Sequence, residues 1–366
     1  MHKKPFSKQR YIAASYDCST KPLSAILTKC LKLVENQHRI LGKRYFNSYG
    51  INPMWIIHNS NAVHSNIDTF NQKKGCKNIR TYDFSTLYTS IPHEKLKHQI
   101  SWCIKEAFKI SKKSYISIYN TYACFTDSPK KSTMSIDCEE FIELIDWLID
   151  NIYITFGDKC FRQIIGIPMG TDCAPFLANL FLYSYEYKWI DEQRKQKKVH
   201  VLKLFKCCSR YIDDLLTINN YNLMKKKMSE IYPPELKLVP DDSDGKTAPF
   251  LDLKVNVEKD GIISTSIFDK RDDFDFPIIN FPTLNGNIPH KSSYGVFIGE
   301  CVRYARACTY YNDFRDRTVS LVEKLETQFF SEKLLKKTWV KFCKTHILLI
   351  QKYGSRILNL HNEWSN

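Results

Sequence analysis

The stretch Val201-Leu-Lys-Leu-Phe-Lys-Cys-Cys-Ser-Arg-Tyr-Ile-Asp-Asp-Leu-Leu-Thr-Ile218 decides the fold class of this chain. It predicts two short strands joined through Tyr211-Ile-Asp-Asp214. Neighbouring residues of an extended strand point to opposite faces, so Asp213 and Asp214 can serve one site only at a tight hairpin tip. An Asp-Asp pair between strands is commonly just a solvated turn. The pair alone does not separate these two interpretations.

A third carboxylate stands in a second predicted strand. Residues 81–90 are rich in aromatic and β-branched side chains and end at Ile91-Pro92, and this segment contains Asp83. Magnesium prefers oxygen ligands, and a few aspartates on rigid elements suffice to hold it. Transfer of a nucleotide to a primer uses two such ions bridged by carboxylates. We therefore expect Asp83, Asp213 and Asp214 to be catalytic and to bind two Mg²⁺ ions, or Mn²⁺ in their place.

Strands and helices alternate in the middle of the chain, and its end is helical. Apolar spacing and turn residues predict helices over residues 24–46, 175–194, 221–231, 293–308, 310–328 and 331–353, a hairpin over 153–164, and strands over 250–257 and 262–268. Pro175 suits a first helical turn, where its missing amide is harmless. This order predicts an α+β fold with a helical lobe attached.

Composition favours a polyanionic partner. The 366 residues include 54 Lys and Arg against 39 Asp and Glu, a formal charge of +15. Such an excess either faces nucleic acid or forms a solvated basic surface. The sequence contains no apolar run long enough to span a membrane, so we expect no membrane partner. Its 13 cysteines form no Cys-x-x-Cys pair, which is typical of reduced thiols in an intracellular protein, nuclear or cytoplasmic.

Four segments in order carry a family resemblance: Tyr82-Asp-Phe-Ser-Thr-Leu-Tyr-Thr-Ser-Ile-Pro-His93, Gly166-Ile-Pro-Met-Gly-Thr-Asp-Cys-Ala-Pro175, Tyr211-Ile-Asp-Asp214 and Phe250-Leu-Asp-Leu-Lys254. Together they resemble the reverse transcriptases of Penelope-like retroelements and their telomerase-like relatives. The resemblance implies a right-hand polymerase with partial fingers (residues 1–80), an antiparallel-sheet palm with fingers insertions (81–284) and a helical thumb (285–366). The thumb helices also fit a helix-turn-helix-like unit. No segment resembles a GIY-YIG endonuclease, so we expect a truncated copy or an element that lacks one.

The resemblance also implies roles around the nucleotide. Asp83 matches the first metal-binding aspartate, and Tyr88 falls where such enzymes place a side chain that crowds a 2′-hydroxyl. Alternatively, Tyr88 only packs inside the palm. Lys8 and Arg10 match cations that grip the triphosphate, or belong to the basic surface. Gly170 would let backbone approach the substrate, while Met169 replaces a glutamine that is common in the family.

On the primer side, the resemblance places Tyr211 beside the primer end. Phe250, Leu251 and Lys254 belong to a strand pair that grips the primer backbone, and Asp252 in that pair is expected to be structural. The thumb would hold the duplex through contacts of lysine and arginine with phosphates, independent of base sequence. Lys237 and Lys246 lie in the region of a proton donor for pyrophosphate, and the sequence does not choose between them.

The expected activity is an RNA-directed DNA polymerase that extends a DNA primer on an RNA template with deoxynucleoside triphosphates and no small-molecule cofactor besides the metal. A catalytically inactive nucleic-acid-binding remnant is the alternative of a different class. An RNA-directed RNA polymerase is a third interpretation, and an aromatic residue at position 88 argues against it.

Overall fold

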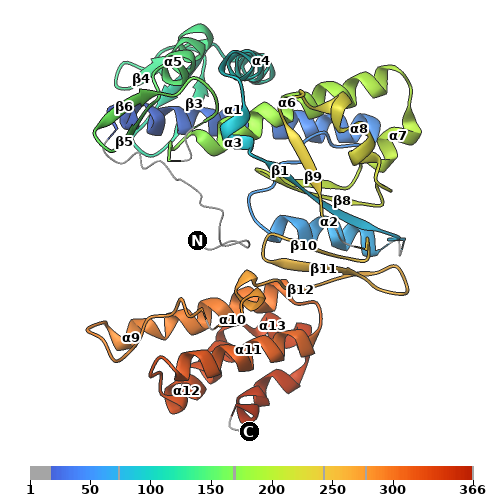
Figure 1. The fold of residues 1–366 in the computed structure, drawn as a ribbon, viewed down its shortest axis with the longest axis vertical. Helices are drawn as coiled ribbons and strands as arrows, with labels where there is room; N and C mark the ends of the chain where they lie inside the picture. The colour runs from blue at the N-terminus through green and yellow to red at the C-terminus, as the bar shows by residue number, and fades with distance from the viewer. Residues whose placement is uncertain (1–17, 73–74, 168–169, 242–243, 277, 365–366) are drawn as a thin grey trace. The chain divides into compact units, whose positions relative to one another are not determined.

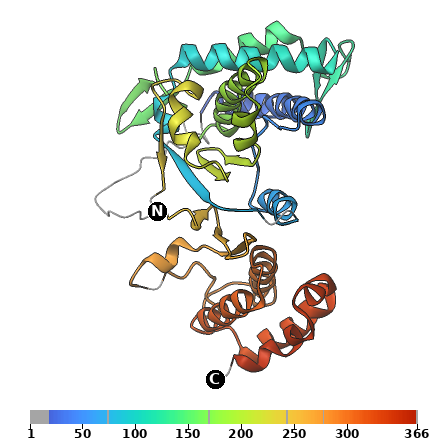
Figure 2. The same ribbon diagram turned by 90° about the vertical axis from the view of Figure 1, so that its right-hand side faces the viewer.

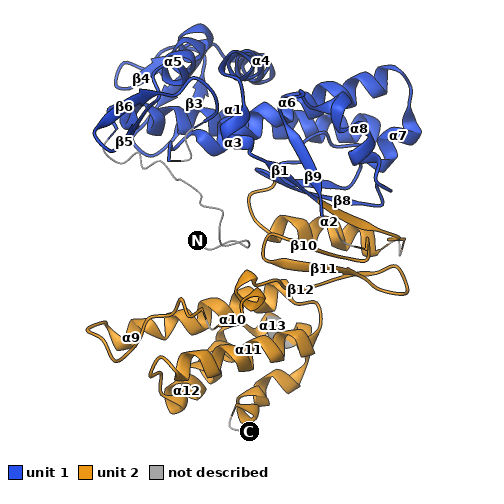
Figure 3. Cartoon of the chain, in the orientation of Figure 1, with its two compact units in different colours: residues 1–56, 82–241 blue, residues 57–81, 242–366 orange. Residues whose placement is uncertain are grey.

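The computed structural model describes residues 18–72, 75–167, 170–241, 244–276 and 278–364, apart from the side chains of residues 349 and 350 (Figure 1). The chain forms two compact units, residues 1–56 with 82–241 and residues 57–81 with 242–366 (Figure 3). Helices and antiparallel sheets are mixed in the chain, which confirms the predicted α+β class. The division into fingers, palm and thumb at residues 80 and 284 stays a prediction, because the two units follow packing and not function.

The first unit is built around a four-stranded sheet with the order β7-β8-β1-β9. Its strands are β1 (Ile79–Ser85), β7 (Cys208–Tyr211), β8 (Asp214–Ile218) and β9 (Lys237–Pro240). β7 pairs with β8 and β1 pairs with β9, both antiparallel. Helices α6 (Ala174–Lys195) and α8 (Leu223–Ile231) lie on one side of this sheet (Figures 1 and 2). Sheet and helices share one core of buried apolar side chains.

The remaining elements of this unit surround that core. They are α1 (Lys21–Tyr49), α3 (Leu87–Ser90), α4 (His93–Ser111), α5 (Cys138–Asp150), α7 (Val199–Leu204), the small sheet of β2 (Tyr115–Ile118), β3 (Ala123–Thr126) and β4 (Met134–Ile136), and the hairpin of β5 (Tyr153–Phe156) and β6 (Lys159–Arg162). The start of α5 is explained by a capping box, in which Asp137 accepts from the amide of Glu140 and the Glu140 side chain accepts from the amide of Asp137.

The second unit combines one small sheet with a helical bundle. The sheet has the order β10-β11-β12, with β10 (Thr247–Phe250), β11 (Leu253–Val257) and β12 (Ile263–Ile267). Its helices are α2 (Asn61–Asn71), α9 (His290–Ser293), α10 (Gly295–Ala307), α11 (Tyr311–Glu326), α12 (Glu332–Thr345) and α13 (Ile347–Tyr353), with 3₁₀ segments η1 (Lys270–Asp273) and η2 (Ser355–Glu363). Trp339 is completely buried in the bundle and packs against Phe297, Phe314 and Phe342.

Four predicted elements differ from the structure. The strand predicted over residues 81–90 ends at Ser85, and residues 87–90 form the short helix α3. The strand predicted over residues 250–257 is broken by a turn at Leu251 and Asp252, and the long helix predicted over residues 331–353 is interrupted at His346. The first part of the segment 201–218 belongs to the helix α7 and not to a strand, and its neighbouring residues Val201 and Leu202 are both buried. Periodicity does not resolve such short apolar runs.

Candidate active site

The hairpin of β7 and β8 ends in a two-residue turn. Tyr211 stands opposite Asp214 in the ladder, so only Ile212 and Asp213 join the strands. Ile212 has a φ of 52°, a left-handed conformation that a β-branched residue rarely adopts. The turn therefore places two adjacent carboxylates at one end of the sheet, as the sequence predicts for a tight tip.

Asp83 lies on the strand next to this tip. The Phe84 amide donates a hydrogen bond to the Asp213 carbonyl over 3.0 Å, which joins β1 to the turn directly. Tyr82 and Phe84 are both 2% exposed and face the core, so the intervening Asp83 points to the other face, where it is exposed. In the described chain its carboxylate takes part in no hydrogen bond or ion pair. Backbone pairing thus brings residues 83, 213 and 214 into one neighbourhood.

The chemistry of these three side chains suits magnesium, but they do not form a ready-made chelate. Carboxylate oxygens are hard donors of the kind Mg²⁺ prefers, and Asp213 and Asp214 are partly exposed. Among the residues that the structure describes, no group of three or more His, Cys, Asp or Glu side chains is arranged to hold a metal ion. Binding of a metal would therefore require the carboxylates to turn toward one another.

Tyr88 lies close to this tip. Thr86 ends the strand in a left-handed conformation, with a φ of 66°, and α3 follows with Tyr88 on its first turn. Burial, and then the charge of Asp213 and the neighbouring Tyr211, raise the pKa of the Tyr88 phenol. The ring is partly buried and packs against the core, while its hydroxyl feels the charge of the turn. Both sequence interpretations of Tyr88, packing and contact with the site, are compatible with this position.

The backbone of Tyr88 packs closely against the loop at Gly166 and Ile167. The Ile167 amide donates to the Tyr88 carbonyl over 2.6 Å, and the Gly166 amide donates to the Ile91 carbonyl over 2.8 Å. Gly166 has a φ of 84°, and a Cβ atom on it would stand 2.4 Å from the Tyr88 carbonyl oxygen. The ring of His93 donates from Nε2 to the Gly166 carbonyl over 2.8 Å. Close approach of the two backbones therefore requires a glycine at position 166, a requirement that the sequence motif did not reveal.

Other predicted nucleotide contacts are less defined. Gly170 lies in the turn before α6 and is partly exposed, while Met169 lies outside the described residues. Lys8 and Arg10 lie outside the described residues as well. Their roles stay predictions.

A charged network beneath the turn was missed at the sequence level. Arg210 of β7 is fully buried, and its Nε donates to Oε1 of the equally buried Glu186 of α6 over 2.7 Å. From the same guanidinium, Nη1 donates to the Ile212 carbonyl over 3.1 Å. An arginine directly before a predicted hairpin tip, in a strand that is otherwise apolar or small, was the available signal.

In the second unit, the predicted primer-binding residues form another hairpin. Phe250 pairs with Leu253 across a two-residue turn, in which Leu251 has a φ of 57°. Phe250 is 2% exposed, so the whole residue is buried and its side chain packs inside the unit. Lys254 is exposed and Leu251 is partly exposed. Asp252 accepts from the Phe268 amide through its carbonyl and lies 3.5 Å from Arg303 through its carboxylate, which agrees with a structural role.

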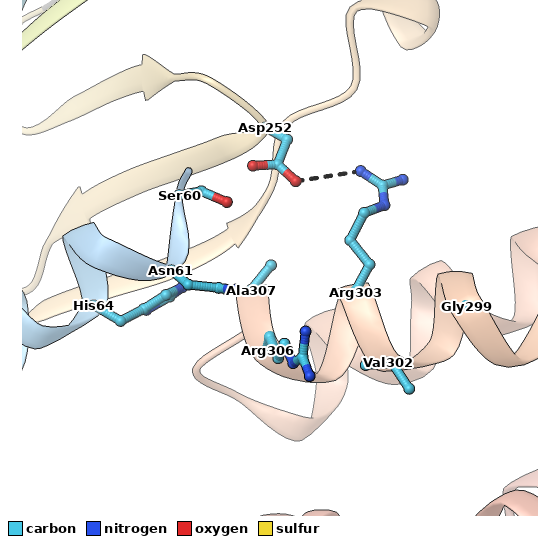
Figure 4. A pocket seen from close by; sticks show the side chains of 9 residues that line it. All are labelled: Ser60, Asn61, His64, Asp252, Gly299, Val302, Arg303, Arg306 and Ala307. Carbon is cyan, nitrogen blue, oxygen red and sulfur yellow. Dashed lines mark hydrogen bonds and ion pairs between the residues drawn. The ribbon is translucent and has the colours of Figure 1, made fainter. Parts of the chain in front are cut away.

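This hairpin borders a small cavity with basic walls (Figure 4). Its volume is about 210 Å³, and it is lined by Ser60, Asn61, His64, Asp252, Gly299, Val302, Arg303, Arg306 and Ala307. Arg303 is held by Glu300 over 2.6 Å and by Asp252. Arg306, one turn of α10 later, is exposed. The rim thus offers one cation that is neutralised by carboxylates and one that faces solvent.

Comparison with known proteins finds similarity at the level of the fold. No family model matches the chain, and no curated protein matches it. The structure of telomerase from Candida albicans in complex with a TWJ fragment of telomeric RNA matches 93% of this chain with a TM-score of 0.60 at 13% identity. This chain spans only 56% of that telomerase.

Two further solved structures are less similar. Telomerase from Candida tropicalis with the TWJ fragment matches 95% of this chain and 51% of its own length, with a TM-score of 0.46 at 16% identity. The Sicinivirus 3Dpol RNA-dependent RNA polymerase matches 76% of this chain and 53% of its own length, with a TM-score of 0.38 at 14% identity. The fold assignment rests on the Candida albicans structure.

The chain therefore has the polymerase fold seen in telomerase, as its α+β architecture with an antiparallel sheet and a helical end predicted. Within the described segments, no helix is both long enough and apolar enough to cross a bilayer.

Proposed function

We propose that this protein is a template-directed nucleotide polymerase of the reverse transcriptase type. The observation that carries the proposal is the hydrogen bond between the Phe84 amide and the Asp213 carbonyl. It joins the strand of Asp83 to the Asp213-Asp214 turn inside a polymerase fold. An ordinary solvated turn would not be expected to lie next to a strand that exposes a third carboxylate.

Asp83, Asp213 and Asp214 would hold two Mg²⁺ ions, which when bound activate the primer hydroxyl and neutralise the triphosphate and the leaving pyrophosphate. The other side chains of the site would contribute by their positions around the substrate and the primer. Tyr211, which stands opposite Asp214 in the hairpin, would border the primer end, as the resemblance implies. The exposed carboxylates on the open face of the sheet leave room for a substrate to approach.

The proposed nucleotide is a deoxynucleoside triphosphate. Tyr88 stands near Asp213 and Tyr211, and the Ile167 amide donates to its carbonyl, so its ring would form a barrier beside the turn. Such a barrier would exclude a 2′-hydroxyl by collision. Lys8 and Arg10 would grip the triphosphate, and Gly170 would lie below the new base pair, as the resemblance implies.

The proposed template is RNA and the proposed primer is DNA, from a Penelope-like retroelement. These assignments rest on the sequence resemblance, since this chain spans about half of the telomerase it matches and shares its fold alone. In the second unit, the exposed Lys254 and Arg306 and the backbone of the partly exposed Leu251 would contact primer phosphates. The formal charge of +15 supports a polyanionic partner.

Primer extension by the purified chain tests the proposal. A labelled DNA primer is annealed to RNA and to DNA templates and incubated with Mg²⁺ and either deoxynucleotides or ribonucleotides. Extension on RNA with deoxynucleotides supports the full assignment, and extension with ribonucleotides alone supports an RNA polymerase. The Asp213→Asn variant is the matched control, since it keeps size and shape but removes a metal ligand. Equal extension by wild type and variant would refute the site.

A second candidate function is binding of nucleic acid without catalysis. The observation that favours it is that the described side chains include no preassembled group of three metal ligands. In that case the purified chain would bind a primer-template duplex but extend no primer in Mg²⁺ or Mn²⁺.

A further inference from the structure

Arg210 and Glu186 form an ion pair that is completely closed off from solvent. Both side chains are 0% exposed, and the guanidinium meets the carboxylate twice, Nε to Oε1 over 2.7 Å and Nη2 to Oε2 over 3.1 Å. Removing two charges from water is unfavourable and is only offset when the geometry is good and the remaining polar atoms have partners. Stability alone therefore does not explain why this ion pair lies in the core.

Every donor of the guanidinium is in use. Nη1 donates to Oδ1 of Asn179 over 2.9 Å and to the Ile212 carbonyl over 3.1 Å, while Nη2 also donates to the Asn179 carbonyl over 3.1 Å. Together with the two bonds to Glu186, these account for the five N–H groups of an arginine. Tyr232 in turn donates to Oε1 of Glu186 over 2.9 Å. Arg210 is therefore not available to bind a substrate, and its role must be exerted through its protein partners.

One of those partners is the strained residue of the turn. Ile212 takes a φ of 52° between Tyr211 and Asp213. A β-branched residue stays in that conformation only when its surroundings determine it. Two hydrogen bonds act on the turn from the protein interior and from the next strand: Arg210 holds the Ile212 carbonyl, and the Phe84 amide holds the Asp213 carbonyl.

We propose that Arg210, oriented by Glu186, is a positioning residue that holds the 212–213 turn in the conformation presenting Asp213 and Asp214 at the open face of the sheet. Its catalytic consequence rests on the proposed function, whereas its effect on the turn does not. The backbone of Arg210 is itself fixed, since its amide donates to the Trp55 carbonyl over 2.7 Å. The side chain of Arg210 thus extends from a fixed backbone position to the turn in which Ile212 has its positive φ.

The variant Arg210→Lys tests this proposal. A lysine keeps the charge beside Glu186, but one ammonium group cannot reproduce the planar fork that reaches Glu186, Asn179 and the Ile212 carbonyl together. Hydrogen exchange of a peptide covering residues 209–216 reports on the turn without any need for activity. We expect exchange of the turn amides to become about tenfold faster and exchange in α4 and α5 to change less. Thermal stability should fall, because buried oxygens of Glu186 and Asn179 lose hydrogen-bond partners.

Rescue by glycine separates positioning from a general structural role. In Arg210→Lys/Ile212→Gly, the residue at 212 adopts a positive φ without assistance, so protection of the turn and primer extension should recover in part. If wild type extends primers, Arg210→Lys should lower kcat by about tenfold or more with a similar KM for the nucleotide, because the defect lies in the arrangement of the carboxylates. A merely structural role would give no recovery with glycine.

A second variant keeps the proposal testable if Arg210→Lys fails to fold. Arg210→Met/Glu186→Leu/Tyr232→Phe replaces the polar network by apolar side chains of similar size, which often preserves stability. We expect a folded protein with an unprotected turn. Normal protection of residues 211–214 in a folded variant of either kind overturns the proposal. Absence of extension by wild type with a protected turn overturns the proposed function instead.

Discussion

The Phe84 amide donates to the Asp213 carbonyl over 3.0 Å, and this bond connects two segments that lie more than a hundred residues apart in the chain. Because Phe84 faces the core, its neighbour Asp83 must face the opposite side. The same sheet therefore presents the carboxylates of the turn and of β1 from adjacent strands.

Replacement of Asp213 by Asn should abolish primer extension and leave duplex binding unchanged. The amide keeps the size of the side chain but removes the charge that a divalent cation requires. Loss of a metal ligand removes stabilisation of the transition state, so we expect at least about a thousandfold drop in rate. Gel-shift titration with a primer-template duplex is the control, and a similar loss of binding would point to a folding defect instead.

Tyr88→Ala should relax discrimination against ribonucleotides. Removal of the ring opens the space beside Asp213 where a 2′-hydroxyl would otherwise collide, and we expect the preference for deoxynucleotides to fall by about tenfold or more. Tyr88→Phe is the matched control, since it keeps the barrier and loses only the hydroxyl. Ratios of kcat/KM for the two nucleotide types measure the effect. An unchanged ratio in Tyr88→Ala would assign Tyr88 to packing alone.

Gly166→Ala should lower thermal stability more than Gly157→Ala. The left-handed backbone costs a non-glycine residue ~1–2 kcal/mol, and the added Cβ would also stand 2.4 Å from the Tyr88 carbonyl oxygen. Gly157→Ala is the matched control, because Gly157 has a φ of 58° but nothing lies within 4 Å of its added Cβ. Thermal melting should show a small loss for Gly157→Ala and a larger one for Gly166→Ala. Equal losses would mean that the loop moves away freely.

Lys254→Ala and Arg306→Ala should each weaken duplex binding without changing base preference. Each removes one exposed cation near the β10–β11 turn, so the slope of log affinity against log salt should fall by about one. Lys259→Ala is the control, because Lys259 is exposed beyond the other end of β11. Equal salt slopes for all three variants and wild type would remove this hairpin from the proposed primer contact.

Stability should fall below neutral pH because of His38. Burial lowers the pKa of its imidazole to about 4, despite the bond its Nε2 donates to the Cys103 carbonyl. The unfolded chain takes up the proton near pH 6.5 and the folded chain does not, so stability is complete above that pH and is lost as pH falls toward 4. At pH 5 the loss is about 2 kcal/mol. Chemical denaturation of wild type and His38→Gln between pH 7 and 5 measures it, and parallel pH profiles would contradict the assignment.

Local sequence was enough to predict several elements of the first unit, but not the small sheet of β2, β3 and β4 or the helix α5. The helix over residues 24–46 and the hairpin over 153–164 are present as α1 and as β5 with β6, because their apolar spacing and glycine turn are local signals. The glycine at 166 was quoted in a motif, yet its requirement comes from the carbonyl of Tyr88, which lies far away in the chain. No local sequence pattern predicts how closely residue 166 approaches the Tyr88 carbonyl.

What the sequence by itself determined is the set of chemical groups and the tight turn, because hairpin length and residue type are encoded within a few neighbouring positions. Only the tertiary structure decided that β1 lies beside β8, that Tyr88 lies near Asp213, and that a buried Arg210 holds the Ile212 carbonyl. These relationships arise from packing of segments distant in the chain. The role of a buried charged side chain such as Arg210 depends on the groups that surround it, and only the complete fold determines which groups these are.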